Sequence, residues 1–225
     1  MNYMDQPLGQ LALRIPGARR LFDDYHLDYC CAGSRTLRAA ADDAGIDAES
    51  LAARLLDMQQ GEETAQDRDW SAASDEALIH HILTRYHAVH REQFPELIRL
   101  AFKVEQVHAG HAACPLGLAD LLQNMEQALS SHMRKEEVVL FPMILDGQGA
   151  MAGMPITMMR MEHDSHGGEL RHLAELTNDF STPDDACATW RMLCAGLRTF
   201  REDLIEHIHI ENNILFERYA PGRAH

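Results

Sequence analysis

The chain has 225 residues, and 46% of them are hydrophobic, which is typical of a globular protein and excludes a disordered one. Its 35 acidic residues outnumber its 20 basic residues, so the formal net charge is −15 with neutral histidines. So acidic a protein is a poor partner for nucleic acid or an anionic membrane surface. The sequence has neither a long apolar run nor a signal-like N-terminus, so we expect no membrane segment and a cytoplasmic protein.

The chain contains five cysteines and 14 histidines. The odd number and scattered spacing of the cysteines argue against a disulfide framework and favour a reducing compartment. Histidine is the commonest metal ligand and the usual acid–base group near neutral pH. The positions of the histidines must therefore decide whether they bind metal or are only tolerated at the surface.

The first 57 residues are predicted to form a small helical N-terminal domain. Short helical patterns follow one another there, and the adjacent pair Cys30 and Cys31 lies in a turn between two of them. Ser34 is a suitable N-cap for the next helix, and Gly45 is expected to end that helix. We therefore expect the two thiols just before a helix N-terminus.

Residues 58–73 are polar and are predicted to be a linker, whereas residues 74–220 have helical periodicity and almost no strand alternation. Four long helical patterns cover 75–108, 116–144, 155–180 and 184–219. Pro95 lies inside the first pattern and is expected to kink that helix without ending it. Since short connections join antiparallel helices, the predicted fold class is all-α, with an up-down four-helix bundle behind the small domain.

Two of these helices carry charged residues on a stripe that should be apolar. The core-facing stripe of the second helix has His132 and Glu136 at successive positions and continues with Val139 and Met143. The stripe of the fourth helix has His207 and Glu211. A carboxylate in a bundle core is costly unless it is paired or binds a cation. Two identical H-x-x-x-E pairs are hard to explain as structure alone, so they indicate a metal site.

The first and third helices carry histidines on the same kind of stripe, at His87 and His90 and at His163 and His166. The step from the first to the second helix, His87 to His132, is 45 residues, and the matching step in the other half is 44. The two halves therefore look like two helical hairpins related by an approximate two-fold axis. Such an axis would place two equivalent metal sites in the middle of the bundle.

Four imidazoles and two carboxylates suit a first-row transition metal better than calcium or magnesium. The set is too large for one structural zinc ion, which takes four ligands. Two irons fit if both glutamates bridge them, each iron takes two histidines, and an oxo group completes the bridge. Each iron then keeps one position for a small molecule. A metal-free interaction bundle is the alternative.

Several short sequence motifs match those of a known family. They are DYCC at 28–31, RYHxxHRE at 85–92, SSHMxKEExxLFPM at 130–143, EHD at 162–164 and HIxxENNxLF at 207–216. The bundle resembles the hemerythrin-like domains, and nearly the whole chain resembles the repair-of-iron-centres family of di-iron proteins. Two positions depart from the family pattern: Ala32 replaces a glycine, and Ser165 stands near where an acidic residue is expected.

The resemblance implies two non-haem iron ions joined by an oxo bridge. It implies iron ligands at His87, His132, Glu136, His163, His207 and Glu211, with both glutamates bridging. It also implies repair of iron–sulfur clusters damaged by nitric oxide or peroxide, by supplying iron. The implied partners are iron–sulfur proteins or a cluster scaffold and the small molecules NO or O₂, and a homodimer is left open.

We also expect Cys30 and Cys31 to act in the chemistry, because a helix dipole would lower a thiol pKa and favour the thiolate. The thiolates would accept iron or exchange electrons with a partner. The remaining cysteines are expected to be core or surface filler: Cys114, Cys187 and Cys194. Glu137 and His209 lie off the core-facing stripes, so we expect both on a solvated face.

Two other functions fit the same residues. One is an enzyme that reduces nitric oxide at the open iron positions and needs an electron donor. The other is a hemerythrin-type carrier or sensor that binds NO or O₂ reversibly and needs no thiols. The extra domain with its cysteine pair makes the carrier the weaker alternative. Turnover with an electron donor would distinguish the enzyme from the repair function. Reversible gas binding without the thiols would distinguish the carrier.

Overall fold

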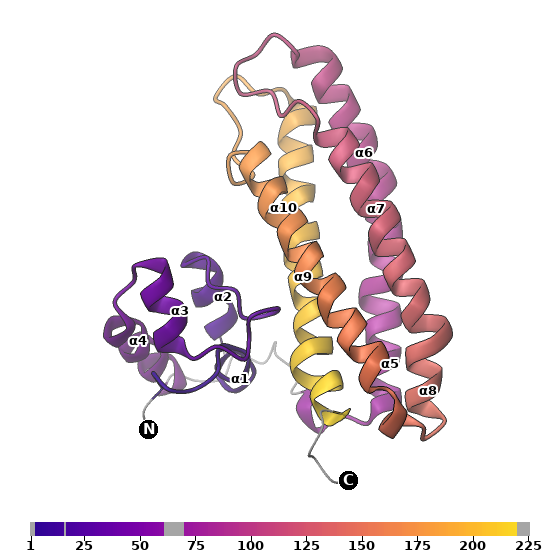
Figure 1. The fold of residues 1–225 in the computed structure, drawn as a ribbon. Coiled ribbons are helices and arrows are strands. Elements are labelled where there is room, and N and C mark those ends of the chain that lie inside the picture. Colours follow the sequence, from indigo (N-terminus) through magenta and orange to yellow (C-terminus); the bar gives the residue numbers. More distant parts are fainter. Residues whose placement is uncertain (1–2, 16, 61–69, 220–225) are drawn as a thin grey trace. The chain divides into compact units, whose positions relative to one another are not determined.

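A computed structural model describes residues 3–15, 17–60 and 70–219, and these segments are helical with connecting turns, as predicted (Figure 1). Pro7 and Thr36 form an isolated bridge, and no strand occurs in the described segments. The chain divides into two compact units, Met1–Ser74 with Ile208–His225, and Asp75–His207. Among the described residues, no helix is both long and apolar enough to cross a bilayer.

The small helical unit contains α1 (Leu8–Arg14), α2 (Ala18–Asp24), α3 (Leu37–Ala44) and α4 (Ala48–Gln60). Thr36, and not the predicted Ser34, caps α3, because its hydroxyl accepts the Ala39 N–H at 3.2 Å. Gly45 ends α3 as predicted, since its φ of 68° lies in the left-handed region that glycine tolerates.

The predicted linker, 58–73, is helical at both ends. Helix α4 continues to Gln60, and a 3₁₀ turn, η1, covers Trp70–Ala72. Arg218 donates hydrogen bonds to the carbonyl oxygens of Trp70 and Ser71 at 3.4 and 3.2 Å, which ties this turn to the C-terminal segment of the same unit. Residues 61–69 of the predicted linker lie outside the described residues.

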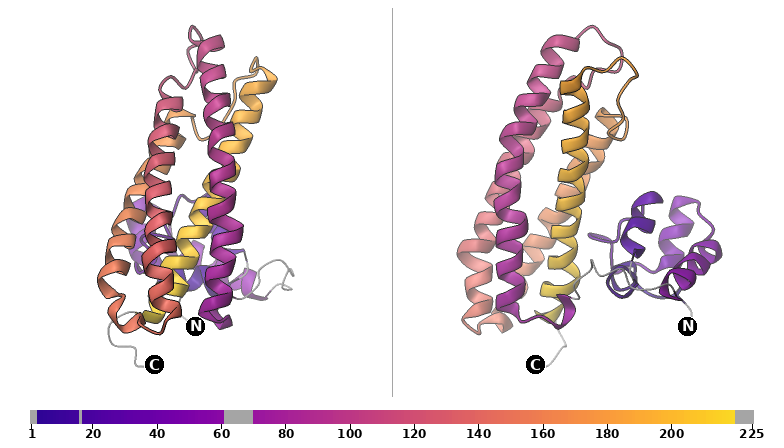
Figure 2. Two further views of the ribbon diagram at one scale, coloured as in Figure 1. Left: turned by 90° about the vertical axis from the view of Figure 1, so that its right-hand side faces the viewer. Right: turned by 180° about the vertical axis from the view of Figure 1, so that it is seen from behind.

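The second unit is a bundle in which four long helices run side by side and alternate in direction (Figures 1 and 2). The helices are α5 (Asp75–His81) with α6 (Ala88–His108), α7 (Leu118–Lys135) with α8 (Phe141–Leu145), α9 (Gly153–Leu176), and α10 (Ala188–Ile210). Helix α6 continues through Pro95. A π-helical turn, η5 (Glu211–Leu215), and a 3₁₀ turn, η6 (Phe216–Tyr219), follow α10 and belong to the C-terminal segment that groups with the small helical unit.

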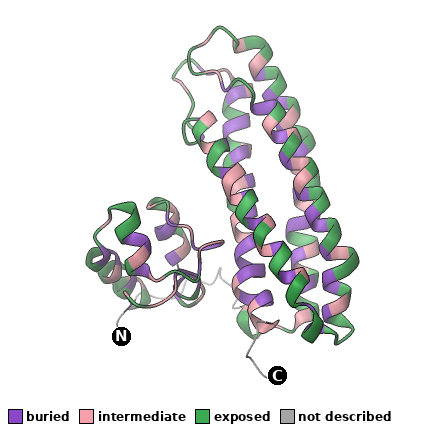
Figure 3. Ribbon diagram, in the orientation of Figure 1, coloured by how far each residue is buried: buried purple, intermediate pink, exposed green. Residues whose placement is uncertain are grey.

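Buried residues form stripes along the bundle helices, and the apolar part of each stripe makes the core (Figure 3). The stripe predicted on α9 is confirmed, since all its members are buried: Ile156, Met159, His163, His166, Leu170 and Leu173. The stripe predicted after Glu136 was wrong. Val139 is 48% exposed, and Leu140 and Ile144 are buried in its place.

The π-helical turn η3 (Glu136–Leu140) explains this shift of the stripe. Two similar turns, η2 (Ile82–His87) and η5 (Glu211–Leu215), occur on other helices. A π turn inserts one extra residue into the helix, so the buried stripe moves by one position along the sequence. Each π turn begins or ends at a predicted metal ligand, and π turns of this kind are frequent at functional sites.

Helix α9 ends at Leu176, and not at the predicted residue 180. Three residues in a row, Asn178, Asp179 and Phe180, have positive φ angles of 46°, 53° and 57°, which a helix does not allow. The Thr177 hydroxyl accepts the Phe180 N–H at 3.1 Å and stabilises this turn. The buried ring of Phe180 then returns to the core.

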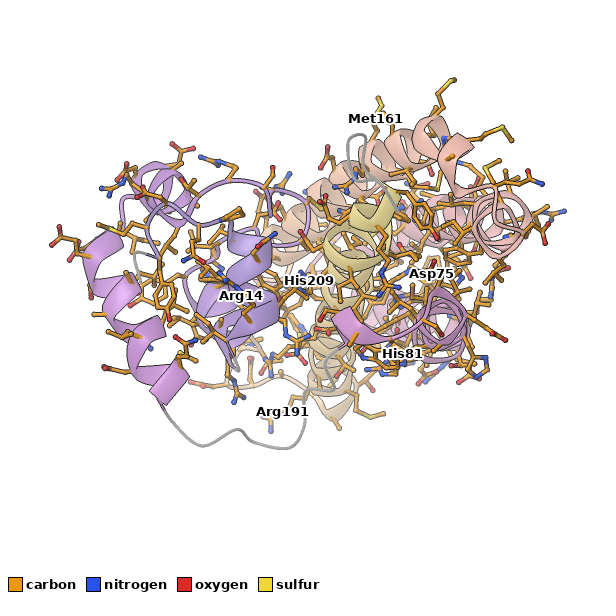
Figure 4. All side chains as sticks on the ribbon, turned by 90° about the horizontal axis from the view of Figure 1, so that it is seen from below. Arg14, Asp75, His81, Met161, Arg191 and His209 are labelled. Carbon is orange, nitrogen blue, oxygen red and sulfur yellow. The ribbon has the colours of Figure 1, made fainter. Side chains whose placement is uncertain are left out.

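The outer face of α9 carries exposed methionines. Met154, Met158 and Met161 are 86%, 52% and 61% exposed and follow one another at helical spacing. Figure 4 shows Met161 on the outside of the bundle. These side chains therefore contribute nothing to the core of the bundle.

Candidate metal centre

The predicted metal ligands are among the most buried residues of the protein. Each has a relative exposure of 1% or less: His87, His132, Glu136, His163, His207 and Glu211. The apolar core described above lies farther along the same helices. Carboxylates in such a place need a positive partner.

These residues form two groups of four. One contains His87 and His207, the other contains His132 and His163, and both contain Glu136 and Glu211. Within each group, one ligand atom per residue lies within 4.8 Å of the others. The Nε2 atoms of the paired histidines are 3.2 Å apart in the first group and 3.0 Å apart in the second.

Glu136 has the geometry of a bridging carboxylate. Its Oε2 lies 3.4 Å from Nε2 of His87, and its Oε1 lies 3.4 Å from Nε2 of His132. The two oxygens of one side chain therefore serve different groups. The donor set of each group is two imidazole nitrogens and two carboxylate oxygens, which suits iron, manganese or zinc and not calcium.

Two further carboxylates fix the tautomers of the histidines. Nδ1 of His87 lies 2.9 Å from Glu137 Oε1, and Nδ1 of His132 lies 3.0 Å from Glu162 Oε2. A carboxylate accepts a hydrogen bond, so we assign the ring proton to Nδ1, and each Nε2 keeps its lone pair for a cation. This is the arrangement in which a carboxylate orients a metal-binding histidine.

The prediction that Glu137 lies on a solvated face was wrong. Its side chain is 28% exposed and accepts hydrogen bonds from His87 and from Arg91, the latter at 2.7 Å. Burial alone would raise the pKa of Glu137, but the hydrogen bonds from Arg91 and His87 lower it overall. Glu137 and Glu162 therefore orient two of the histidines, although Ser165 stands near where the family pattern has an acidic residue.

Two more histidines are buried beside the groups. The His90 ring centroid lies 5.3 Å from that of His207, and the His166 ring centroid lies 5.2 Å from that of His132. Their Nδ1 atoms contact Gln93 Oε1 at 3.1 Å and Glu169 Oε2 at 2.9 Å. Neither belongs to the two groups of four, and burial lowers the pKa of His90 to about 3.

The thiols of Cys30 and Cys31 lie 3.6 Å apart in the small helical unit, and neither cysteine forms a disulfide. The predicted helix dipole is missing, because α3 begins at Leu37, after the Thr36 cap. A hydrogen bond with Cys31 and burial both raise the pKa of the Cys30 thiol well above its usual value, and the charge of Asp28 adds to this. The prediction of an activated Cys30 thiolate was therefore wrong for the protein without a bound cation.

The C-terminal segment contributes residues whose role the sequence did not indicate. Asn212 donates a hydrogen bond to the Cys30 carbonyl at 3.0 Å, and Asn213 donates to the Tyr29 carbonyl at 3.3 Å. Nδ1 of His209 lies 3.0 Å from the Asn213 amide, and His209 is only 1% exposed. The prediction that His209 lies on a solvated face was therefore wrong.

Comparison with known proteins agrees with this donor set. Residues 78–219 match the model of the hemerythrin HHE cation binding domain, and residues 4–59 match a domain of unknown function, DUF542. The chain belongs to the hemerythrin-like family. The family resemblance predicted from the sequence is therefore confirmed, and the cation-binding description fits the buried histidines and glutamates.

Relatives of this hemerythrin-like protein match it over nearly its whole length. The iron–sulfur cluster repair protein YtfE of Dickeya chrysanthemi is 48% identical over 222 residues, which cover 99% of this chain and 100% of the relative. A probable iron–sulfur cluster repair protein of Haemophilus influenzae is 46% identical over 218 residues, covering 97% and 98%. YtfE of Escherichia coli O157:H7 is 46% identical over 222 residues, covering 99% and 100%.

Proposed function

We propose that this hemerythrin-like protein holds two iron ions, joined by an oxo bridge, and supplies iron to repair damaged iron–sulfur clusters. The observation that carries the proposal is Glu136, whose two oxygens each lie 3.4 Å from a histidine of a different group. The relatives named as cluster repair proteins match over nearly all of this chain, including its cysteine-bearing part. The partner would be an iron–sulfur protein or a cluster scaffold.

The side chains of the bundle have separate tasks in this proposal. The four histidines would hold the ions, while Glu137 and Glu162 keep the ring protons of His87 and His132 on Nδ1. Glu136 and Glu211 would neutralise part of the positive charge of the ions. When bound, the iron pair supplies Lewis acidity and one-electron redox chemistry.

The thiols of Cys30 and Cys31 are the second part of the proposal. They would accept iron leaving the bundle or exchange electrons with the partner, and the acidic chain would favour a basic partner surface. Replacing both with serine is expected to abolish cluster repair while the bundle still binds two irons. Iron content and recovery of a damaged [4Fe–4S] enzyme are the two readouts.

A matched control replaces Cys114 and Cys187 with serine. These two cysteines are free and half-buried like Cys31, but they lie outside the pair, so repair is expected to stay at the wild-type level. Unchanged repair by the Cys30→Ser/Cys31→Ser variant would remove the thiols from the mechanism. Loss of iron from that variant would show instead that the serines disturb the bundle.

A second candidate is the reduction or binding of a small oxidant such as nitric oxide. The observation in its favour is the buried pair His90 and His166, whose Nε2 atoms have no hydrogen-bond partner among the described residues. Each lies against a histidine of one group, where a small polar ligand would find a partner. Steady N₂O production by the reduced protein with an electron donor would favour catalytic reduction, whereas one stoichiometric reaction would exclude turnover and leave only binding.

A further inference from the structure

The loop that carries the two cysteines brings a third ligand-type group to them. Asp28 Oδ1 lies 3.3 Å from the Cys30 sulfur, and the two sulfurs are 3.6 Å apart. One ligand atom each from Asp28, Cys30 and Cys31 lies within 4.8 Å of the others. We propose that Asp28, Cys30 and Cys31 form a separate binding site for a divalent first-row cation, Fe²⁺ or Zn²⁺.

The spacing of the three groups fits one tetrahedral ion. Zinc binds sulfur at about 2.3 Å and carboxylate oxygen at about 2.0 Å, so the tetrahedral edges are about 3.8 Å between sulfurs and about 3.5 Å from sulfur to oxygen. The observed separations of 3.6 and 3.3 Å are shorter than these edges by about 0.2 Å. A cation therefore needs only a small adjustment of the side chains.

The loop is held in this shape by hydrogen bonds that do not depend on a cation. Asp28 Oδ1 accepts the N–H groups of Cys31 at 2.9 Å and Ala32 at 3.2 Å, which keeps the carboxylate over the thiols. Ala32 therefore provides the N–H group that this turn needs, although the family pattern has glycine at this position. Gly33 cannot be replaced as easily, because a Cβ would lie 2.5 Å from the Tyr29 carbonyl oxygen.

The negative charges that two thiolates and a carboxylate would carry favour binding of a cation. The Cys30 sulfur lies within hydrogen-bond distance of both Asp28 Oδ1 and the Cys31 sulfur. A divalent cation would displace the thiol protons to solvent, and its charge would offset the negative charges of the two thiolates and the carboxylate. Two sulfurs and one oxygen select iron, zinc or cobalt over magnesium and calcium.

The partial exposure of the site indicates exchange and not permanent storage. Cys30 is buried, whereas Asp28 and Cys31 are half-buried, so the three groups are not fully enclosed and leave room for a fourth ligand. A site with three protein ligands and one open position can pass its ion to another molecule. This inference concerns binding at the loop and does not depend on iron donation by the bundle.

Cobalt titration of the full-length, reduced protein with its bundle already loaded with iron tests the site. We expect one further cobalt ion per chain, with a thiolate-to-cobalt charge-transfer band that nitrogen and oxygen ligands cannot produce. Cys30→Ser/Cys31→Ser should abolish the band. Asp28→Asn, which keeps an oxygen acceptor for the loop N–H groups, should weaken cobalt binding about tenfold or more.

The control variant Cys114→Ser/Cys187→Ser should keep the full band, which excludes the Cys187 sulfur beside His108 as its source. Thermal melts confirm that each variant is folded. No thiolate band in the wild type, or a band that survives in Cys30→Ser/Cys31→Ser, overturns the site. A folded Asp28→Asn variant with wild-type affinity overturns the role of Asp28. Cluster repair is measured separately, so its failure leaves the binding result intact.

Discussion

Replacing Glu136 or Glu211 with alanine is expected to remove both metal ions from the bundle. Each of these glutamates belongs to both groups of four, so its loss leaves two incomplete donor sets. The remaining set at each position would be two histidines and one carboxylate, and the variant should fall from about two ions per chain to nearly none under chelator competition. Metal analysis after dialysis measures the result.

Histidine variants provide the contrast for this prediction. His87→Ala damages one group and leaves the other group complete, so about one ion per chain should remain. His163→Ala damages the other group and should also leave about one ion per chain. Glu96→Gln is the surface control. Glu96 pairs with Arg99 on the outside of α6, so this variant should keep both ions. Equal metal loss in the glutamate and histidine variants would contradict the shared role of Glu136 and Glu211.

Removing the metal is expected to destabilise the bundle strongly. Glu136 and Glu211 are fully buried, and their oxygens lie within 4.8 Å of one another, so the cations offset both repulsion and desolvation. One ion at a thousandfold excess over its Kd contributes about 4 kcal/mol. For a chain of this size, each kcal/mol shifts Tm by about 2–4 °C, so the loss of one ion should lower Tm by about 8–16 °C.

A single variant separates this explanation from a general effect of the chelator. Glu136→Gln keeps the shape of the side chain but removes its charge, so it should raise the Tm of the metal-free protein and lower the Tm of the metal-loaded protein. Scanning calorimetry of both forms measures the two changes. A shift in the same direction in both forms would show that the charge of Glu136 is not balanced by a cation.

The sequence was sufficient to predict the bundle and its buried histidine–glutamate pairs, because a polar residue on an apolar helical stripe stands out. It was not sufficient to predict the π turns. The extra residue in Glu136–Leu140 places Leu140 in the core instead of Val139. The residue types in this segment do not indicate that a π turn occurs there.

Residues that act across helices were also missed. Glu137 was expected in solvent because it lies beside the core-facing stripe of its own helix, yet it reaches His87 on a different helix. His209, expected in solvent for the same reason, is buried, and Asn212 contacts Cys30 although they are 182 residues apart in sequence. Periodicity describes one helix at a time, so it cannot identify such partners.

Mössbauer spectroscopy with metal analysis of the purified, iron-loaded protein tests the central claim most directly. The buried groups around Glu136 and Glu211 predict two irons per chain in similar nitrogen- and oxygen-rich environments, magnetically coupled through an oxygen bridge. One iron per chain, or two irons without magnetic coupling, would contradict the shared centre.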